Sequence, residues 1–115
     1  MNSKDLVKLA YQALEDKKGH DIRIIDIASV SSMGDYFIIA DGSNRNQVQA
    51  LCDNVEEVLH KAGAKLKNRE GYANGGWILL DYYDIIIHIF VEEERSFYDL
   101  EHVWRDGTPI SINDL

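Results

Sequence analysis

The chain of 115 residues has one cysteine, one proline and no long apolar run. The single cysteine, Cys52, excludes a disulfide within the chain and any cysteine-rich zinc site. No apolar segment follows the amino terminus as in a signal peptide, and the apolar runs elsewhere are too short to cross a membrane. We therefore expect one cytoplasmic domain over residues 1–115, with a core over about 3–106 and a tail over 107–115.

Basic residues are also scarce, because 12 Lys and Arg stand against 20 Asp and Glu, a net charge of −8. An acidic protein gains nothing by releasing cations from a phosphate backbone, so little direct contact with nucleic acid is expected, and none with an anionic membrane. The imbalance is uneven, since residues 72–115 hold two bases and nine acids. This last third would attract a basic partner.

Two stretches have apolar residues at helical spacing. The first covers residues 3–18 with Ser3 as its expected N-cap, and the second begins at a cap formed by Ser43 or Asn44. A third, short helix is expected to begin at Glu92–Glu94, because negative side chains are favourable near a helix amino terminus.

Strands are expected where apolar residues follow one another. Residues 22–27 and 36–40 predict two strands, and the uninterrupted second run is typical of a strand covered on both faces. Residues 77–80 and 85–91 flank a short polar link and predict a hairpin, while residues 107–115 are expected to fray unless they pair at a sheet edge. The fold class is therefore α/β, in its α+β form, with a mixed sheet flanked by helices.

A search for catalytic groups gives one alternative. The Gly42–Ser43 turn opens a helix and could hold a phosphate, as in nucleotidyltransferases. Such enzymes also need two carboxylates spaced D-x-D for metal ions. The nearest pairs are Asp81–Asp84 in a hairpin link and Asp99–Glu101 on a helix, and neither directs two carboxylates to one point. We expect a capped helix start, no enzyme, no cofactor and no metal, and keep a degenerate nucleotide-binding domain or enzyme as the alternative.

Two further residues have reactive side chains in apolar surroundings. His88 interrupts an apolar strand and is expected to be a neutral, hydrogen-bonded, buried histidine rather than a catalyst. Cys52 lies on the apolar stripe of the second helix and is expected to serve packing.

Aromatic residues gather in the acidic last third of the chain. They are Trp77, Tyr82, Tyr83, Phe97, Tyr98 and Trp104. Aromatic anchors surrounded by charge are typical of a protein-binding patch. The alternative is that Phe97 and Trp104 only attach the last helix to the sheet.

Short motifs follow one another in a specific order along nearly the whole chain. They are Asp35-Tyr36-Phe37, Gly42-Ser43, Arg45, Gln47-Val48-Gln49-Ala50, Glu70-Gly71, Trp77-Ile78-Leu79-Leu80-Asp81, Asp84, His88-Ile89-Phe90, and Arg95-x-Phe97-Tyr98-x-Leu100-Glu101-x-x-Trp104. From about Lys4 to Trp104 the chain resembles the Iojap-related family, the ribosomal silencing factor S proteins. One departure is Tyr83, since the family usually has Gly in this turn and Tyr disfavours positive φ.

The resemblance implies a core similar to that of nucleotidyltransferases without the metal carboxylates. It also implies a translational repressor that binds the large ribosomal subunit through ribosomal protein fourteen and sterically blocks joining of the small subunit when nutrients are short. A homodimer in isolation is implied as well. The expected contacts combine two aromatic anchors, one apolar residue and four acids, namely Trp77, Tyr98, Leu100, Glu70, Asp81, Asp84 and Glu101. Arg95 is expected to pair with nearby carboxylates, and His88 and Phe90 are expected to belong to the sheet.

Overall fold

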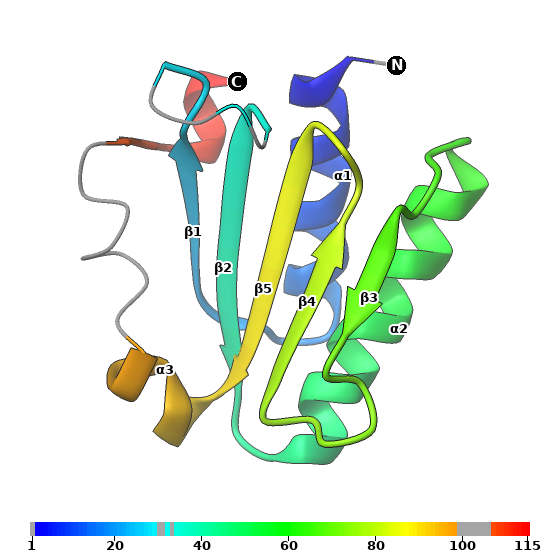
Figure 1. The fold of residues 1–115 in the computed structure, drawn as a ribbon, viewed down its shortest axis with the longest axis vertical. Coiled ribbons are helices and arrows are strands. Elements are labelled where there is room, and N and C mark those ends of the chain that lie inside the picture. The colour runs from blue at the N-terminus through cyan, green and yellow to red at the C-terminus, as the bar shows by residue number, and fades with distance from the viewer. Residues whose placement is uncertain (1, 30–31, 33, 99–106) are drawn as a thin grey trace.

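The structure is a computed structural model that describes residues 2–29, 32, 34–98 and 107–115. Six strands form one mixed sheet in the order β3-β4-β5-β2-β1-β6 (Figure 1). The strands are β1 (His20–Asp26), β2 (Tyr36–Gly42), β3 (Asn68–Glu70), β4 (Trp77–Asp81), β5 (Ile85–Val91) and β6 (Thr108–Ile110). The helices are α1 (Ser3–Asp16), α2 (Arg45–Lys61), α3 (Glu92–Tyr98) and a 3₁₀ turn at Ile112–Asp114. This α+β architecture confirms the predicted fold class.

Both long helices lie on one face of the sheet (Figure 1). Each begins with an asparagine cap, because the side chain of Asn2 accepts from the backbone N–H of Asp5 and that of Asn44 accepts from Gln47. Of the two predicted caps for α2, Ser43 or Asn44, the structure has Asn44, and the predicted cap at Ser3 is wrong by one residue. The helices and the sheet enclose the main apolar core.

The central strands are the most hydrophobic parts of the chain. Every residue of β2 and β5 is buried, and the two strands pair in parallel. β4 and β5 form the predicted antiparallel hairpin. Buried side chains also line the sheet face opposite α1 and α2, namely Ile25, Ile27, Phe37, Ile39, Ile86 and Phe90. The sheet is thus covered on both faces, as the apolar run in β2 predicted.

Two edge strands complete the sheet. β3 pairs with β4 inside a segment that the sequence marks only as polar. β6 pairs antiparallel with β1, so the carboxyl-terminal tail joins the sheet edge instead of fraying. Edge strands this short expose few unpaired backbone groups, which limits accidental pairing between molecules.

The third helix is attached to the sheet by an ion pair. The guanidinium of Arg95 lies 2.9 Å from the carboxylate of Asp41 and 3.4 Å from that of Asp21. It also donates to the backbone carbonyl oxygens of Asp21, at 2.6 Å, and of His20, at 3.3 Å. The expected pairing of Arg95 with nearby carboxylates is confirmed, and it fixes α3 to the start of β1 and the end of β2.

Candidate functional site

The side chains of β4 alternate between the two faces of the sheet. Ile78 and Leu80 join the core under α2, so Trp77, Leu79 and Asp81 point to the opposite face. In the register of β3 with β4, Glu70 lies opposite Leu79 and Asn68 lies opposite Asp81. Residues directly opposite in a ladder share a face. We call Asn68, Glu70, Trp77, Leu79 and Asp81 together the β3–β4 face.

Trp77 and Leu79 are the half-buried apolar residues of this face. The indole of Trp77 stacks on the ring of Phe90, with 5.0 Å between centroids and 25° between planes. Its Nε1–H donates to Nδ1 of His88 at 3.1 Å. Trp77 is therefore held from the sheet side, while part of its surface remains exposed.

His88 lies under the indole in the middle of β5. Its ring contacts Phe37, at 4.8 Å between centroids, and only 4% of the residue is exposed. Burial lowers the pKa of His88 to about 4. The prediction of a neutral, hydrogen-bonded, buried histidine is confirmed.

The acids of this region lie at the margin of the apolar pair. Glu70 is exposed and accepts from the side-chain amide of Asn68 at 3.2 Å. Asp81 accepts from the backbone N–H of Tyr83 at 2.8 Å, at the start of the hairpin turn. Asp84 is exposed in the same turn. Four of the seven predicted contact residues, Glu70, Trp77, Asp81 and Asp84, therefore lie on or next to one surface.

The other three predicted contacts lie at or beyond the end of α3 in the sequence. Tyr98 is the last residue of α3, and Leu100 and Glu101 lie outside the described residues. The same is true of Trp104 and of the Asp99–Glu101 pair.

The described acidic residues of the last third lie at more than one place. Asp84 precedes β5 and Glu92–Glu94 follow it, and a seven-residue strand spans roughly 23 Å. Glu94 in addition lies 3.8 Å from the guanidinium of Arg45. Among the residues that the structure describes, the acids of the last third are therefore divided between two ends of the sheet.

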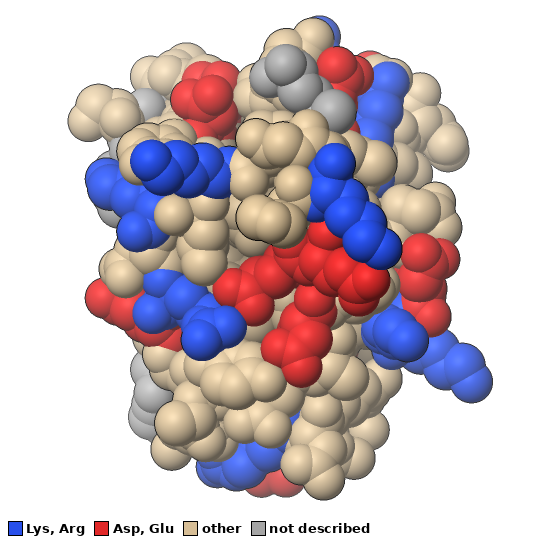
Figure 2. All heavy atoms as spheres, turned by 90° about the vertical axis from the view of Figure 1, so that its right-hand side faces the viewer, with Lys and Arg blue, Asp and Glu red and all other residues tan. Residues whose placement is uncertain are grey.

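The side of the molecule formed by α2 and β3 has mixed charge. Figure 2 shows acidic side chains gathered at the middle of this side, with lysines and arginines around them. Glu56 lies 2.9 Å from Arg69, and Glu57 lies 3.0 Å from Lys61. Local pairing makes this side a poorer attractor of a basic partner than its acids alone suggest.

One group on α2 has the residue types of a metal site. Ligand atoms of Cys52, Asp53 and Glu56 lie within 4.8 Å of one another. However, Glu56 is paired with Arg69, and Asp53 accepts from the hydroxyl of Tyr72 at 3.1 Å. Burial raises the pKa of the Cys52 thiol to about 12, so it stays protonated. A cation there would compete with a guanidinium, and Cys52 serves packing as predicted.

A hollow of about 380 Å³ lies at the amino terminus of α2, where the nucleotide-binding alternative would place a phosphate. It is lined by Ser43, Asn44, Arg45, Asn46, Val91 and Glu93. The side chain of Gln47 accepts from the backbone N–H and the hydroxyl of Ser43, at 2.7 and 2.9 Å. The turn is thus closed by its own side chains, and the carboxylate of Glu93 would repel a phosphate.

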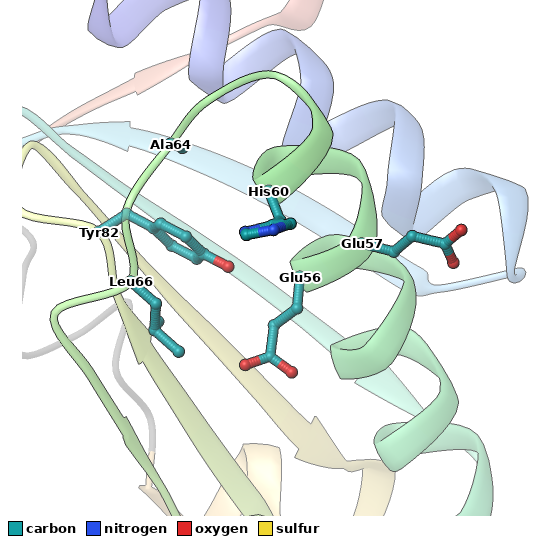
Figure 3. A pocket seen from close by; sticks show the side chains of 6 residues that line it. All are labelled: Glu56, Glu57, His60, Ala64, Leu66 and Tyr82. Atoms are coloured by element: carbon teal, nitrogen blue, oxygen red, sulfur yellow. The ribbon is translucent and has the colours of Figure 1, made fainter.

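A second hollow, of about 310 Å³, lies beside the carboxyl-terminal turns of α2. It is lined by Glu56, Glu57, His60, Ala64, Leu66 and Tyr82. Figure 3 shows the hydroxyl of Tyr82, the ring of His60 and the carboxylate of Glu56 turned toward the same space, and Glu57 turned away. Since Glu56 is already paired with Arg69, this hollow has no uncompensated charge to select a ligand.

Sequence reasoning missed two members of the β3–β4 face, Asn68 and Leu79. Leu79 could have been found, because alternation from Trp77 to Asp81 places it on the same face. Asn68 could not have been found, because the sequence of β3 does not resemble that of a strand. Only the pairing of β3 with β4 shows on which face of the sheet Asn68 lies.

The chain was compared with known proteins. The sequence model of the family described as "Ribosomal silencing factor during starvation" matches residues 1–115. The ribosomal silencing factor of Bacillus subtilis is 37% identical over 93% of this chain and 91% of its own length. That of Halalkalibacterium halodurans is 32% identical over 100% of this chain and 98% of its own. A crystal structure of a Chromobacterium violaceum protein has a TM-score of 0.89 and 36% identity, covering 90% of this chain and 87% of that one.

The sheet face with its half-buried tryptophan, together with hollows whose lining is unsuited to a phosphate or a metal ion, is typical of a protein that works by binding through a surface. The comparisons name the class more closely, as regulators of the ribosome rather than enzymes. The chain belongs to the ribosomal silencing factor family. Among the described residues, no helix is long and apolar enough to cross a membrane.

Proposed function

We propose that this protein represses translation in the cytoplasm when nutrients are short, by binding ribosomal protein fourteen on the large subunit and blocking the small subunit. The observation that supports it is the β3–β4 face, where Trp77 and Leu79 are half-buried next to Glu70 and Asp81. An apolar centre bordered by acids suits a basic protein surface. The same acids repel phosphates, which favours docking on protein over general adhesion to RNA.

The proposed action is steric. A bound domain of 115 residues would occupy part of the surface that the small subunit needs, so no bond-forming step is required. Tyr98, Leu100 and Glu101 are proposed as further contacts. Residues 1–115 are proposed to act as one domain.

Subunit association measured by light scattering tests the proposal. Added to purified large and small subunits, the protein should lower the yield of joined ribosomes in proportion to its occupancy of the large subunit. Undiminished joining at a several-fold excess of the protein would rule the proposal out. A pull-down with isolated ribosomal protein fourteen tests the partner separately.

A tryptophan truncation tests the surface. Trp77→Ala should weaken binding to the large subunit by at least about 30-fold, since central aromatic anchors contribute about 2 kcal/mol or more. Tyr72→Ala is the matched control, because it removes a half-buried aromatic side chain that lies beside Arg69 and Asp53 on the α2 side. Equal losses in the two variants would contradict the assignment of the surface.

Two further features are proposed from the family resemblance. One is a core similar to nucleotidyltransferases but without metal carboxylates, for which titration with nucleotide and Mg²⁺ should leave tryptophan fluorescence unchanged. The other is a homodimer, for which light scattering at several concentrations should show a mass that rises toward twice 13.1 kDa.

A further inference from the structure

The orientation of Trp77 depends on a residue that the proposed docking surface does not itself include. Trp77 is the first residue of β4 and lies directly opposite Phe90 of β5. Its ring leans diagonally toward His88, two residues earlier in β5, and Nε1–H donates to Nδ1 of His88 at 3.1 Å. The indole therefore has a stacking partner and a separate hydrogen-bond partner.

The hydrogen bond determines where His88 carries its proton. Because Nδ1 accepts from the indole, the neutral ring carries its proton on Nε2. Nε2 is buried and has no hydrogen-bond partner in the part of the chain that the structure describes. A buried donor without an acceptor lowers stability.

An apolar side chain at this position would avoid that cost. The neighbours of His88 in β5, Ile87 and Ile89, are aliphatic and fully buried. His88 provides a hydrogen-bond acceptor under the indole of Trp77, and an aliphatic residue would not.

Stacking on Phe90 and the hydrogen bond to His88 constrain the indole in different ways. The stack constrains the plane of the ring, with 25° between the two ring planes. The hydrogen bond is directional, and it holds the Nε1 edge of the indole at Nδ1 of His88. The hydrogen bond therefore adds to the stack a restraint on which edge of the indole faces outward.

We infer that His88 is a positioning residue, which fixes the indole of Trp77 in the orientation presented to the basic partner protein. The inference rests on the proposed function, since it concerns the same surface. An anchor held in one orientation before contact loses less conformational freedom on binding, which increases affinity. His88 acts entirely through Trp77, because its own ring is buried.

A matched pair of substitutions isolates the acceptor. Asn and Leu have nearly the same shape, but only Asn has an oxygen near the place of Nδ1. His88→Leu should weaken binding to the large subunit by about 10-fold, as expected for loss of one hydrogen bond that orders an anchor. His88→Asn should stay within about 3-fold of the unmodified protein. Ile86→Val controls for loosening of β5, because Ile86 lies on the same sheet face and does not contribute to the hydrogen bond.

The chemical shift of the indole N–H proton of Trp77 reports on the hydrogen bond itself, and a change in packing alone would not produce the same shift. In ¹H–¹⁵N spectra its resonance, assigned with Trp77→Phe, should shift upfield in His88→Leu and remain near its original position in His88→Asn. A double variant completes the test. In a Trp77→Phe background, which has no indole N–H, His88→Leu should cause no further loss of binding.

The outcomes separate the two ideas. If the unmodified protein binds the large subunit but folded His88→Leu binds equally well, the positioning role is wrong and the proposed function stands. An unshifted indole resonance, or an added loss in the Trp77→Phe background, also overturns the positioning role. If the unmodified protein does not bind the large subunit, the proposed function itself fails.

Discussion

Tyr83 occupies a backbone conformation that suits glycine. It lies in the turn between β4 and β5 with φ of +71°. A side chain in this left-handed region costs roughly 1–2 kcal/mol. The sequence left the turn geometry open at Tyr83, and the structure shows that the turn keeps a positive φ with tyrosine in it. The turn persists because its backbone is held on both sides, through the bond of Tyr82 N–H to Ile85 and that of Tyr83 N–H to Asp81.

Replacing this tyrosine should therefore stabilise the protein. Tyr83→Gly is expected to raise the free energy of unfolding by about 1 kcal/mol, because relief of the strain exceeds the entropy that glycine gains when unfolded. The lost contact with the ammonium of Lys67, 5.7 Å from the ring centroid, is a small term at an exposed site. Urea unfolding measures the change. Tyr83→Ala, which keeps the strain and loses the ring, should show no gain, and a less stable Tyr83→Gly would contradict the account.

The buried histidine makes stability depend on pH. The pKa of His88 is lowered to about 4 by burial, against an ordinary value near 6.5. Well above pH 6.5 the residue is neutral in the folded and the unfolded protein, so it adds no pH dependence to the free energy of unfolding. As pH falls from 6.5 to 4, the unfolded chain takes up a proton that the folded chain does not, so stability is lost, by about 3 kcal/mol in total.

Unfolding free energies at pH 7 and pH 4.5 measure this loss. The unmodified protein should lose more stability between the two values than His88→Leu, by about 2 to 3 kcal/mol. The other titrating groups are common to both proteins and cancel in the comparison. An equal pH dependence in the two proteins would show that His88 is not buried in its neutral form.

At the scale of elements, the guanidinium of Arg95 joins α3 to the sheet. Arg95 is buried, and its partner Asp41 belongs to the end of β2. Arg95→Met should lower the free energy of unfolding by about 3 to 5 kcal/mol, because it leaves a buried carboxylate without its cation. Urea unfolding measures the loss.

A second variant separates the charge from packing. Combining Arg95→Met with Asp41→Asn should recover part of the loss, since the buried carboxylate is then also removed. Additive losses in the double variant would indicate that Arg95 stabilises α3 through its packing instead.

The central elements could be predicted from the sequence and the edges could not. The apolar runs of β2 and β5 are local signals that were read correctly, and the start of α2 was narrowed to a cap at Ser43 or Asn44, of which Asn44 is the cap. β3 consists of three exposed polar residues, and only its pairing with β4 makes it a strand. A signal that depends on a partner distant in the sequence is not visible in a local pattern.

The same distinction holds for the candidate site. Trp77 and Asp81 share a face by simple alternation along one strand, which the sequence shows directly. The place of Glu70 beside Leu79 depends on the register of two strands. The hydrogen bond from Trp77 to His88 crosses the hairpin diagonally, so it requires the geometry of the folded sheet.

At the scale of the whole molecule, position matters more than the sum of charges. Within the part of the chain that the structure describes, acids gather at the hairpin end of the sheet, at the start of α3 and on the side of α2. Of these, the acids at the hairpin end and on β3 lie beside the half-buried Trp77 and Leu79. If the proposed surface is correct, equal changes of charge at different places should have unequal effects on binding.

Two charge reversals test this directly. Asp84→Lys and Glu57→Lys each change the net charge by the same amount at an exposed residue. Asp84 lies beside the β3–β4 face, whereas Glu57 lies on α2 and pairs with Lys61. Asp84→Lys should slow association with the large subunit several-fold at low salt, because complementary charge accelerates encounter. Glu57→Lys should have a smaller effect.

Added salt should reduce the difference between the two variants. At about 0.5 M salt charges are screened beyond roughly 4 Å, so the association rates of both variants should approach that of the unmodified protein. Stopped-flow light scattering with purified large subunits gives these rates. A local effect of the β3–β4 face requires Asp84→Lys to associate more slowly than Glu57→Lys at low salt. If the two variants associate equally slowly, the total charge of the protein directs docking and the proposed surface does not.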